Sequence, residues 1–265
     1  MNILVCVKQV PDTTEIKIDP ETNTLIRDGV PSIVNIYDGY ALEMAARIKD
    51  KREAKIVVIA MGPGQAKAAL KDCLAVGADK AYLVSDRVFS GSDTLATGYV
   101  LSEAIKVVEA QEGAFDLIFC GKQAIDGDTA QVGPQLAECM DLPQITCIIG
   151  VEILEGKIRA ERETEKGNEM WEASLPAVVT VTKPAYDPRY PTIKSKMAAN
   201  RAEIPVLSSE EVIVEKERCG LKGSPTKVKK TFVPVLNRNG IIIKDEAAAE
   251  SAGRLSALLC DAGLV

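Results

Sequence analysis

The chain of 265 residues contains no histidine. This absence removes the usual general base, the imidazole partner of a catalytic serine or cysteine, and the commonest zinc ligand. Hydrolysis by side chains alone is therefore disfavoured, and we predict neither a catalytic side chain nor a metal site. If the protein takes part in redox chemistry, an organic cofactor must carry the electrons.

The chain also lacks paired cysteines, long apolar runs and a positive net charge. Its seven cysteines never form a C-x-x-C pair, so we interpret them as reduced thiols. No apolar run approaches the roughly 20 residues of a transmembrane helix, and residues 1–8 do not follow a signal-peptide pattern. The formal charge of −6 disfavours binding to nucleic acid or to an anionic membrane. We expect a cytoplasmic protein with no nucleic acid partner and no direct membrane insertion.

Two common nucleotide-binding motifs are missing as well. No G-x-G-x-x-G follows the first predicted strand, and no G-x-x-x-x-G-K-[ST] occurs anywhere. Their absence disfavours an ordinary Rossmann dinucleotide site and a P-loop phosphotransferase.

What the first 140 residues do contain is a regular alternation of strands and helices. Apolar runs at 3–7, 55–61, 80–84 and 116–120 predict strands, and helical patterns lie between them. This rhythm predicts an α/β fold with a doubly wound, mainly parallel sheet. We expect Asp38 to cap the first helix, Gly77 to close the second, and Ser92 or Asp93 to cap the third.

Two segments depart from this alternation. Residues 11–31 are rich in charges and turn residues, which predicts a β-excursion in the first crossover. From 145 to 182 apolar residues recur with period two around turns at 155–156 and 166–168, which predicts an antiparallel meander that extends the sheet. We therefore place one α/β domain at residues 1–184, with the meander at 145–182.

Residues 185–265 are predicted to form an extended arm that ends in a helix. Several prolines interrupt helix formation after residue 183. A final helix is predicted from about 245 to 260, with Ala248, Ala252, Leu255 and Leu259 on one face. Periodicity leaves two interpretations open: this region docks on a partner subunit, or it folds back on its own domain.

Candidate binding residues gather where the predicted parallel strands end. Cys6 and Lys8 follow the first strand, Met61 and Gly62 end the second, and residues 35–38 begin the first helix. Open α/β sheets bind ligands at this edge. A lone surface lysine or a short glycine turn is commoner than a binding site, but the convergence of several such turns favours a nucleotide crevice.

The most informative segment is GKQAIDGDTAQVG at 121–133, between a predicted strand and a predicted helix. Free backbone amides near residues 129–132 would point toward an anion at the start of that helix. Glycines in the turn allow a ligand to approach the backbone closely. Asp126 and Asp128 would repel a phosphate, so we expect them to cap the helix or to accept hydrogen bonds from sugar hydroxyls.

These residues resemble the electron transfer flavoprotein β subunit. The stretches that carry the resemblance are VCVKQVPD at 5–12, LKDCLAVGAD at 70–79, the segment at 121–133, LPAVVT at 175–180 and PRY at 188–190. The resemblance implies a HUP-like adenine-nucleotide-binding fold, an α subunit that holds a FAD, and a β-subunit crevice for AMP or for the adenosine end of a second FAD. The residues expected to bind the cofactor are Cys6, Lys8, Asn35, Tyr37, Asp38, Met61, Gly62, Ser92, Asp93, Thr94, Gly121, Lys122, Gln123, Ala124, Ile125, Asp126, Gly127, Asp128, Thr129, Ala130, Gln131 and Val132.

Other stretches resemble the flavin-bifurcating branch of that family: RDGVP at 27–31, SDR at 85–87, SGSDTLAT at 90–97, DGDTAQVGP at 126–134 and GSPT at 223–226. This branch implies FAD in the crevice and NADH as the electron donor. One electron would pass to ferredoxin or flavodoxin. The other would pass through the α-subunit FAD to a FAD-dependent dehydrogenase of the acyl-CoA or hydroxyacid-oxidising type. Many relatives have proline after the matching asparagine, whereas Ile36 follows Asn35 here.

Residues 189–197 match the family's partner-recognition loop. The match implies that Ile193 is the apolar anchor for the dehydrogenase, with Met197 beside it, and that the arm at 185–265 docks on the α subunit. As an electron-transfer subunit the chain is not a complete enzyme by itself. Two other functions stay open: a non-bifurcating carrier subunit with structural AMP, and a stand-alone nucleotide-sensing module.

Overall fold

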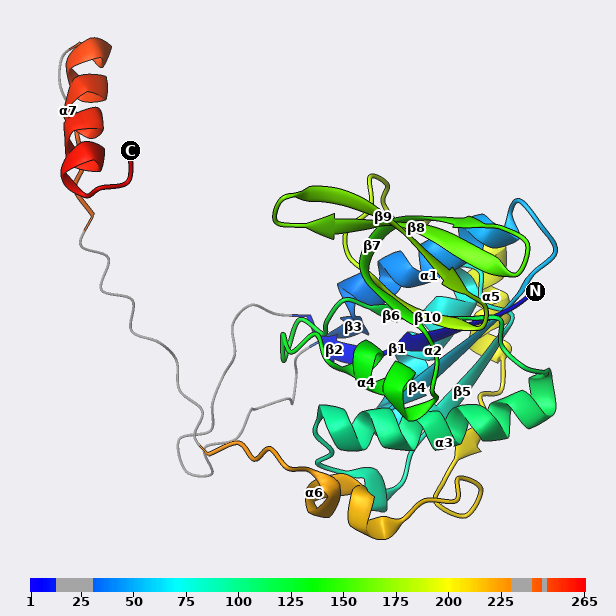
Figure 1. The fold of residues 1–265 in the computed structure, drawn as a ribbon. Helices are drawn as coiled ribbons and strands as arrows, with labels where there is room; N and C mark the ends of the chain where they lie inside the picture. Colours follow the sequence, from blue (N-terminus) through cyan, green and yellow to red (C-terminus); the bar gives the residue numbers. More distant parts are fainter. Residues whose placement is uncertain (13–30, 230–239, 245–246) are drawn as a thin grey trace. The chain divides into compact units, whose positions relative to one another are not determined.

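The computed structural model describes residues 1–12, 31–229, 240–244 and 247–265 (Figure 1). The strands are β1 (Asn2–Val7), β2 (Gln9–Pro11), β3 (Ser32–Val34), β4 (Lys55–Met61), β5 (Lys80–Val84), β6 (Leu117–Gly121), β7 (Gln144–Ile153), β8 (Lys157–Thr164), β9 (Gly167–Ser174), β10 (Ala177–Val181) and β11 (Val206–Leu207). The helices are α1 (Ile36–Lys49), α2 (Lys67–Ala75), α3 (Thr94–Glu112), α4 (Val132–Cys139), α5 (Ile193–Arg201), α6 (Gly220–Gly223) and α7 (Ala248–Asp261), with short 3-10 turns η1 (Gly64–Ala66), η2 (Arg87–Phe89) and η3 (Lys216–Arg218).

The main sheet has the order β11-β5-β4-β1-β6-β10-β7-β8-β9. From β11 through β7 every neighbouring pair is parallel, and the pairs formed by β7, β8 and β9 are antiparallel. Chain connections run outward in both directions from β1, so the order reverses between β1 and β6. The doubly wound, mainly parallel α/β fold is therefore confirmed, and its topological switch point lies between β1 and β6.

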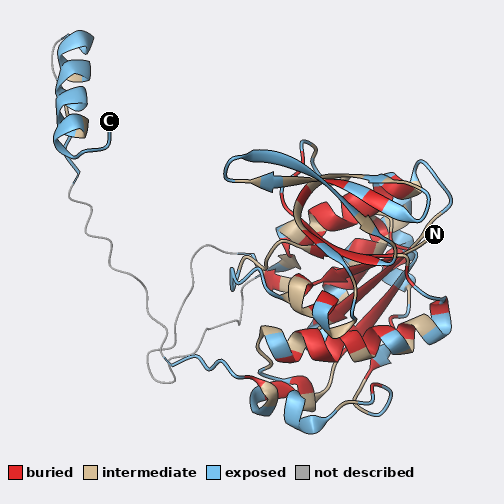
Figure 2. Cartoon of the chain, viewed as in Figure 1, coloured by how far each residue is buried: buried red, intermediate tan, exposed pale blue. Residues whose placement is uncertain are grey.

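Two hydrophobic layers enclose the parallel strands. Alternate residues of β1 face opposite layers: Ile3 and Val5 pack with α1 and α2, whereas Leu4 and Cys6 pack with α3 and α4. Figure 2 shows the strands of this region as mostly buried and the outer sides of the helices as exposed. Burial on both faces explains why these strands are continuous apolar runs in the sequence.

The meander prediction is wrong for its last strand. β7, β8 and β9 form the antiparallel meander, but β10 returns to the parallel part of the sheet and lies between β6 and β7, parallel to both. All five residues of β10 are buried. A strand that is buried on both faces fits the parallel centre of a sheet and not a half-solvated meander.

Helix termini agree only in part with the sequence signals. The side chain of Asp93 caps α3 by accepting a hydrogen bond from the Ala96 amide, and Gly77 follows α2 with a φ of +138°. Asp38 does not cap α1, because that helix begins at Ile36 and Asp38 lies buried in its first turn. For the predicted β-excursion at 11–31, the structure pairs β2 with β3 in antiparallel fashion, and residues 13–30 lie outside the described residues.

The chain divides into two compact units, Met1–Lys229 and Lys230–Val265. We expected a boundary at 184/185; the structure puts residues 185–229 with the first unit because α5 packs on α2 and β11 pairs with β5. In the second unit, helix α7 has no buried residue. Among the described residues, no helix combines the length and apolarity required to cross a bilayer.

Candidate functional site

A cavity of about 930 Å³ opens at the carboxyl ends of β1, β4, β5 and β6, at the switch point of the sheet. We call it the crevice. Among the described residues its lining is Cys6, Val7, Lys8, Asn35, Asp38, Met61, Gly62, Pro63, Val84, Ser85, Asp86, Arg87, Phe89, Ser90, Gly91, Ser92, Asp93, Thr94, Thr97, Leu101, Cys120, Gly121, Lys122, Gln123, Ala124, Gly127, Thr129, Ala130, Gln131, Val132 and Gly133.

The buried carboxylate of Asp38 joins the two strands on either side of the switch point. It accepts hydrogen bonds from the Lys8 amide (2.7 Å) at the end of β1 and from the Gly121 amide (3.2 Å) at the end of β6. Burial raises the pKa of Asp38 to about 7, although these hydrogen bonds and the Lys8 charge oppose the shift. Asp38 therefore fixes the floor of the crevice.

Asn35 holds the loop that follows β6. Its side-chain nitrogen donates to the Gln123 carbonyl (2.8 Å), and its side-chain oxygen accepts from the Ile125 amide (3.1 Å). The residue is almost completely buried, so these bonds form without competition from water. Asn35 thus shapes the 121–128 turn from the adjacent helix start, and Ile36 takes the first position of α1.

Two acidic residues of that turn bind to neighbouring side chains and not to the start of α4. Asp126 forms an ion pair with Lys8 (2.7 Å), and Asp128 accepts from the Gln123 amide group (2.6 Å). The N-cap of α4 is Gln131, which makes no side-chain capping bond. Of the two roles expected for Asp126 and Asp128, capping of this helix is therefore wrong, and hydrogen bonding to sugar hydroxyls stays a prediction. Asp128 and Ala130 both have positive φ, a conformation that side-chain-bearing residues rarely adopt.

The first turns of α3 and α4 meet beside the crevice. The Thr94 hydroxyl donates to the Gln131 side-chain oxygen (3.0 Å), which joins the first residue of α3 to the N-cap of α4. One turn further along α3, a Cβ on Gly98 would lie 3.3 Å from the Gln135 Cβ, so the helices are closely packed there. The first amides of α4 have no side-chain cap, whereas the Ala96 amide of α3 donates to the Asp93 carboxylate, so the uncapped donors at this wall belong to the start of α4.

A loop near the end of the first unit is attached to the start of α3. Asp93 accepts from both the amide (3.0 Å) and the hydroxyl (2.8 Å) of Thr226, and its own amide donates to the Ser224 hydroxyl (2.8 Å). The Ser92 hydroxyl accepts from the Gly220 amide (3.0 Å). Ser92 and Asp93 thus use their side chains to hold this wall of the crevice together.

Two glycines of the 121–133 segment are required by protein packing. A Cβ on Gly121 would lie 2.3 Å from the Asp38 carboxylate, and a Cβ on Gly133 would lie 2.4 Å from the Thr180 methyl group. A Cβ on Gly127 would meet no atom within 4 Å. Of the three, only Gly127 faces open space in the crevice.

Two thiols form part of the crevice wall. Cys6 and Cys120 are partners in the register of β1 and β6. A hydrogen bond with Cys6, together with burial, raises the pKa of the Cys120 thiol well above its usual value. A thiol that stays protonated is a poor nucleophile, so this wall is neutral.

A second exposed surface lies on α5, whose start is fixed by a capping box between Thr192 and Ser195. Ile193 is 83% exposed and Met197 is 53% exposed, and both line a shallow groove on that helix. Just before the helix, Tyr190 is 93% exposed. Large apolar side chains at such exposure are typical of an interaction surface.

A family model described as an electron transfer flavoprotein domain matches residues 22–212. The chain belongs to the electron transfer flavoprotein family. Electron transfer flavoprotein subunit beta of Megasphaera elsdenii is 51% identical over 255 residues, which cover 95% of this chain and 94% of that protein. Subunit beta of Thermoanaerobacterium thermosaccharolyticum is 52% identical over 243 residues, 91% of this chain and 92% of the relative.

A third relative is subunit CarD of the caffeyl-CoA reductase-Etf complex of Acetobacterium woodii, 45% identical over 256 residues and 96% of each chain. These matches confirm the resemblance to electron transfer flavoprotein beta subunits that we inferred from the sequence. The matches cover 92–96% of these relatives and 91–96% of this chain, so the likeness reaches into both units of the chain.

Within this family fold, most of the expected cofactor-binding residues line one crevice. Four of them, Tyr37, Ile125, Asp126 and Asp128, do not line it. The crevice also has lining residues that were not expected from the sequence, chiefly Ser85, Arg87, Ser90 and Gly91 just after β5. Their position at the carboxyl end of a predicted parallel strand was the signal that identified Cys6 and Met61, and the same signal would have found them.

Proposed function

We propose that this chain is the beta subunit of a cytoplasmic, heterodimeric electron transfer flavoprotein and that its crevice holds a FAD. The observation that carries the proposal is the meeting of two helix starts, α3 and α4, at one wall of the crevice. At α4 the first amides have no side-chain cap, at α3 the Asp93 carboxylate accepts from the Ala96 amide, and both starts present the positive ends of helix dipoles. Two of them side by side suit a diphosphate group better than the single phosphate of AMP.

The residues of the crevice fit the adenosine-diphosphate end of FAD. The volume of about 930 Å³ is near the upper end of the range of roughly 300–1,000 Å³ for small-molecule sites, so a dinucleotide has room. Arg87 and Lys122 add positive charge to the lining. The carboxylate of Asp86 is engaged by the Ser209 hydroxyl (2.6 Å) and the Val88 amide (3.0 Å). The amides of residues 129–133 and the start of α3 would hold the diphosphate.

Bound FAD would supply the chemistry, by accepting a hydride and passing on electrons singly. The chain itself binds and orients. Asp38 and Asn35 fix the floor and the 121–128 turn, and the paired thiols give a neutral wall. Since the chain has no histidine, we assign it no acid-base step. Its contribution is the position of the cofactor and the polarity around it.

We further propose that NADH donates the hydride and that the two electrons then separate. One passes to ferredoxin or flavodoxin, and the other passes through the α-subunit FAD to a dehydrogenase of the acyl-CoA or hydroxyacid-oxidising type. Two observations support this proposal: the stretches that resemble the bifurcating branch, and the similarity to CarD, a subunit of a caffeyl-CoA reductase-Etf complex.

The nucleotide content of the purified heterodimer tests the proposal directly. We expect two FAD per heterodimer, measured by acid extraction and chromatography of the released nucleotides. One FAD with one AMP would instead establish the non-bifurcating carrier. A stable, isolated chain that binds nucleotide with no α subunit would favour the stand-alone sensing module.

We assign the dehydrogenase contact to the exposed residues Ile193 and Met197. Burial of an isoleucine side chain stabilises a complex by about 1.5–3 kcal/mol, so Ile193→Ala is expected to weaken dehydrogenase affinity roughly tenfold to a hundredfold. Electron transfer to the dehydrogenase, measured against dehydrogenase concentration, reports this change. Flavin content is expected to stay normal, and unchanged transfer kinetics would contradict the assignment.

The α7 helix is our proposed contact to the α subunit. Its apolar face includes Leu255, which is half exposed, and no residue of the helix is buried. A helix with one apolar face gains most of its stability by packing that face. Leu255→Asp is therefore expected to reduce recovery of the heterodimer in gel filtration, and full recovery would contradict this contact.

A further inference from the structure

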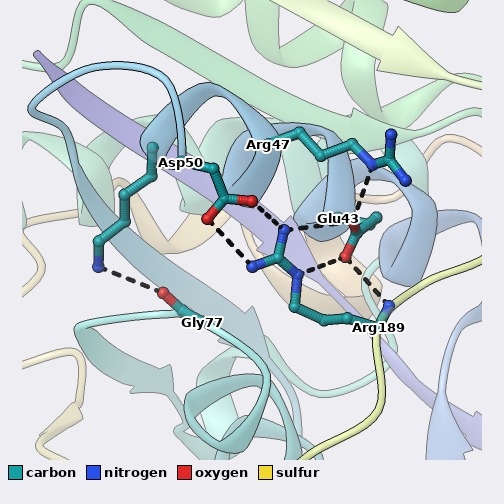
Figure 3. Close-up of polar contacts among 6 residues, drawn as sticks. Glu43, Arg47, Asp50, Gly77 and Arg189 are labelled. Carbon is teal, nitrogen blue, oxygen red and sulfur yellow. Dashed lines mark hydrogen bonds and ion pairs between the residues drawn. The ribbon is translucent and has the colours of Figure 1, made fainter.

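The segment that leads into α5 is fixed to α1 by one arginine. The guanidinium of Arg189 donates to Glu43 on α1 (2.8 Å from Nε) and to Asp50 at the end of the same helix (2.7 Å from Nη2) (Figure 3). The backbone amide of Arg189 also donates to Glu43 (3.1 Å). Glu43 therefore holds both the main chain and the side chain of this residue.

Two neighbouring residues lie along the same helix. The guanidinium of Arg47 stacks over the Tyr186 ring at 3.7 Å and also donates to Glu43 (2.9 Å), as Figure 3 shows for the second contact. A Cβ on Gly39 would lie 4.0 Å from the Pro188 ring. Residues 186–189 thus follow the surface of α1 without forming a helix or strand of their own.

The residues that follow are exposed but held at both ends. Ile193 begins α5 four residues after Arg189, and the far end of α5 is held by the Lys71 ammonium, which donates to the Asn200 carbonyl (2.8 Å), and by buried Ala199. Between these points lie the exposed side chains of Tyr190, Ile193 and Met197. We call residues 190–197 the docking segment.

We propose that Arg189 is a positioning residue that fixes the docking segment to α1 and so presents Ile193 and Met197 in the orientation that the partner dehydrogenase binds. This inference rests on the proposed function of those two side chains. An exposed segment that is already ordered loses less conformational entropy when a partner binds. A bidentate arginine suits the task, because its planar fork fixes direction as well as distance.

The same helix serves the crevice. Asn35 precedes α1 and Asp38 lies in its first turn, whereas Glu43 and Asp50 hold Arg189 further along. One rigid element therefore carries both the floor of the crevice and the anchor of the docking segment. A partner that docks on Ile193 is thereby placed relative to the crevice by the length of α1 and not by a loose loop.

The electrostatics favour this arrangement. Glu43 is buried, and the hydrogen bonds from Arg189 and Arg47 outweigh that burial and lower the pKa of Glu43 below its usual value. Removing the arginine outright would leave a buried carboxylate with one partner fewer, so Arg189→Ala risks general misfolding. Two gentler changes test the positioning role. Arg189→Lys keeps the positive charge but loses the planar guanidinium, and Asp50→Asn removes the charge of the exposed carboxylate that accepts from Arg189.

The experiment measures electron transfer from the heterodimer to the dehydrogenase as a function of dehydrogenase concentration. We expect KM for the dehydrogenase to rise about 2- to 5-fold in Asp50→Asn and about tenfold in Arg189→Lys, with kcat unchanged. Amide hydrogen exchange in residues 193–197 is expected to be faster in both variants. Glu103→Gln, the same type of change in an ion pair on α3, is the matched control and is expected to alter neither quantity.

Ile193→Ala in the same assay separates the docking role of Ile193 from the positioning role of Arg189. If Ile193→Ala raises KM and neither Asp50→Asn nor Arg189→Lys does, docking stands and the positioning role is overturned. If Ile193→Ala leaves KM unchanged, both fail together. A parallel loss of kcat, flavin content and thermal stability in Asp50→Asn would also overturn the inference, because it would reveal a general structural role.

Discussion

Each end of the parallel sheet contains a buried carboxylate, and the pKa values of the two carboxylates are shifted in opposite directions. Helix α3 runs from one end to the other: its first residue borders the crevice, and its last residue, Glu112, lies where β4 and β5 begin. Glu112 is surrounded by the Lys55 ammonium (2.5 Å), the Lys80 ammonium (2.7 Å) and the Tyr82 hydroxyl (2.5 Å). These donors outweigh burial and lower the pKa of Glu112 to about 2.

At the crevice end, Asp38 accepts hydrogen bonds from the Lys8 and Gly121 backbone amides and from the Asn35 side chain, and none of the ion pairs among the described residues includes it. Burial raises its pKa to about 7. Nearby, Asp128 and Ala130 have positive φ, and the start of α4 has no side-chain cap. The buried carboxylate is therefore neutralised by lysines at one end of the sheet, whereas at the other end it lies beside the cavity to which we assign a ligand.

The largest effect is expected at Glu112, at the end of the sheet where β4 and β5 begin. Glu112→Gln removes the charge that two lysines share, and we expect the free energy of unfolding to fall by about 2–3 kcal/mol. Urea denaturation measures this loss. Glu103→Gln, in an exposed pair on the same helix, is expected to cost less than about 0.5 kcal/mol. Weaker nucleotide binding in Glu112→Gln, with no loss of stability, would contradict the view that Glu112 stabilises the fold and does not serve the crevice.

The next largest effect is expected at Asp38, at the crevice end of the sheet. In Asp38→Asn an amide donor would face the backbone amide of Lys8 or Gly121, so one of the two hydrogen bonds is lost. We expect a loss of about 1–2 kcal/mol in the free energy of unfolding, together with weaker nucleotide binding as the floor of the crevice shifts. Isothermal titration with AMP measures the binding. Affinity equal to that of the unchanged protein would show that Asp38 does not shape the crevice.

The same carboxylate makes the stability of the fold depend on pH. Because the folded-state pKa of Asp38 is raised from 3.8 to about 7, the folded protein binds this proton more tightly than the unfolded chain does. The contribution of Asp38 to stability is therefore greatest below about pH 4 and is lost as the pH rises to about 7, by at most about 1.4 kcal/mol per pH unit.

Denaturation of the protein and of Asp38→Asn at pH 5 and pH 8 tests this dependence. We expect the unsubstituted protein to lose part of its advantage over Asp38→Asn as the pH rises. A gap that widens from pH 5 to pH 8 would mean that the folded-state pKa of Asp38 is depressed.

The smallest effect is expected at the rim of the crevice. Lys8 and Asp126 are both partly exposed, so Lys8→Gln is expected to change the free energy of unfolding by less than about 1 kcal/mol. The change is expected to shrink as salt is added, because solvent ions screen an exposed pair. Urea denaturation at low and high salt measures it, and a large effect that salt does not alter would place this pair among the buried interactions.

Local patterns predicted much of this molecule. The apolar runs at 55–61 and 80–84 have the bounds of β4 and β5, and the turns at the strand ends do converge on one crevice. What failed depends on contacts between distant segments. The role of Asp38 depends on β1 lying beside β6, and a position near a helix start suggested a cap instead.

Two other misses have identifiable causes. The run Ala-Val-Val-Thr-Val of β10 has no polar alternation, and this pattern is the signal that separates a parallel central strand from a meander strand. The attachment of residues 185–229 to the first unit rests on the pairing of β11 with β5 and on the Arg189 contacts to α1. Neither leaves a local pattern in a proline-rich stretch.

Gly121 and Gly133 have a consequence for how kinship among such proteins is interpreted. A descendant of this chain without the proposed nucleotide site would still need both glycines, because any side chain there would collide with Asp38 or Thr180. Their survival through evolution would therefore report the inherited scaffold alone. Gly127 has open space around it, so protein packing does not require a glycine there, and purifying selection at that position would report the proposed ligand.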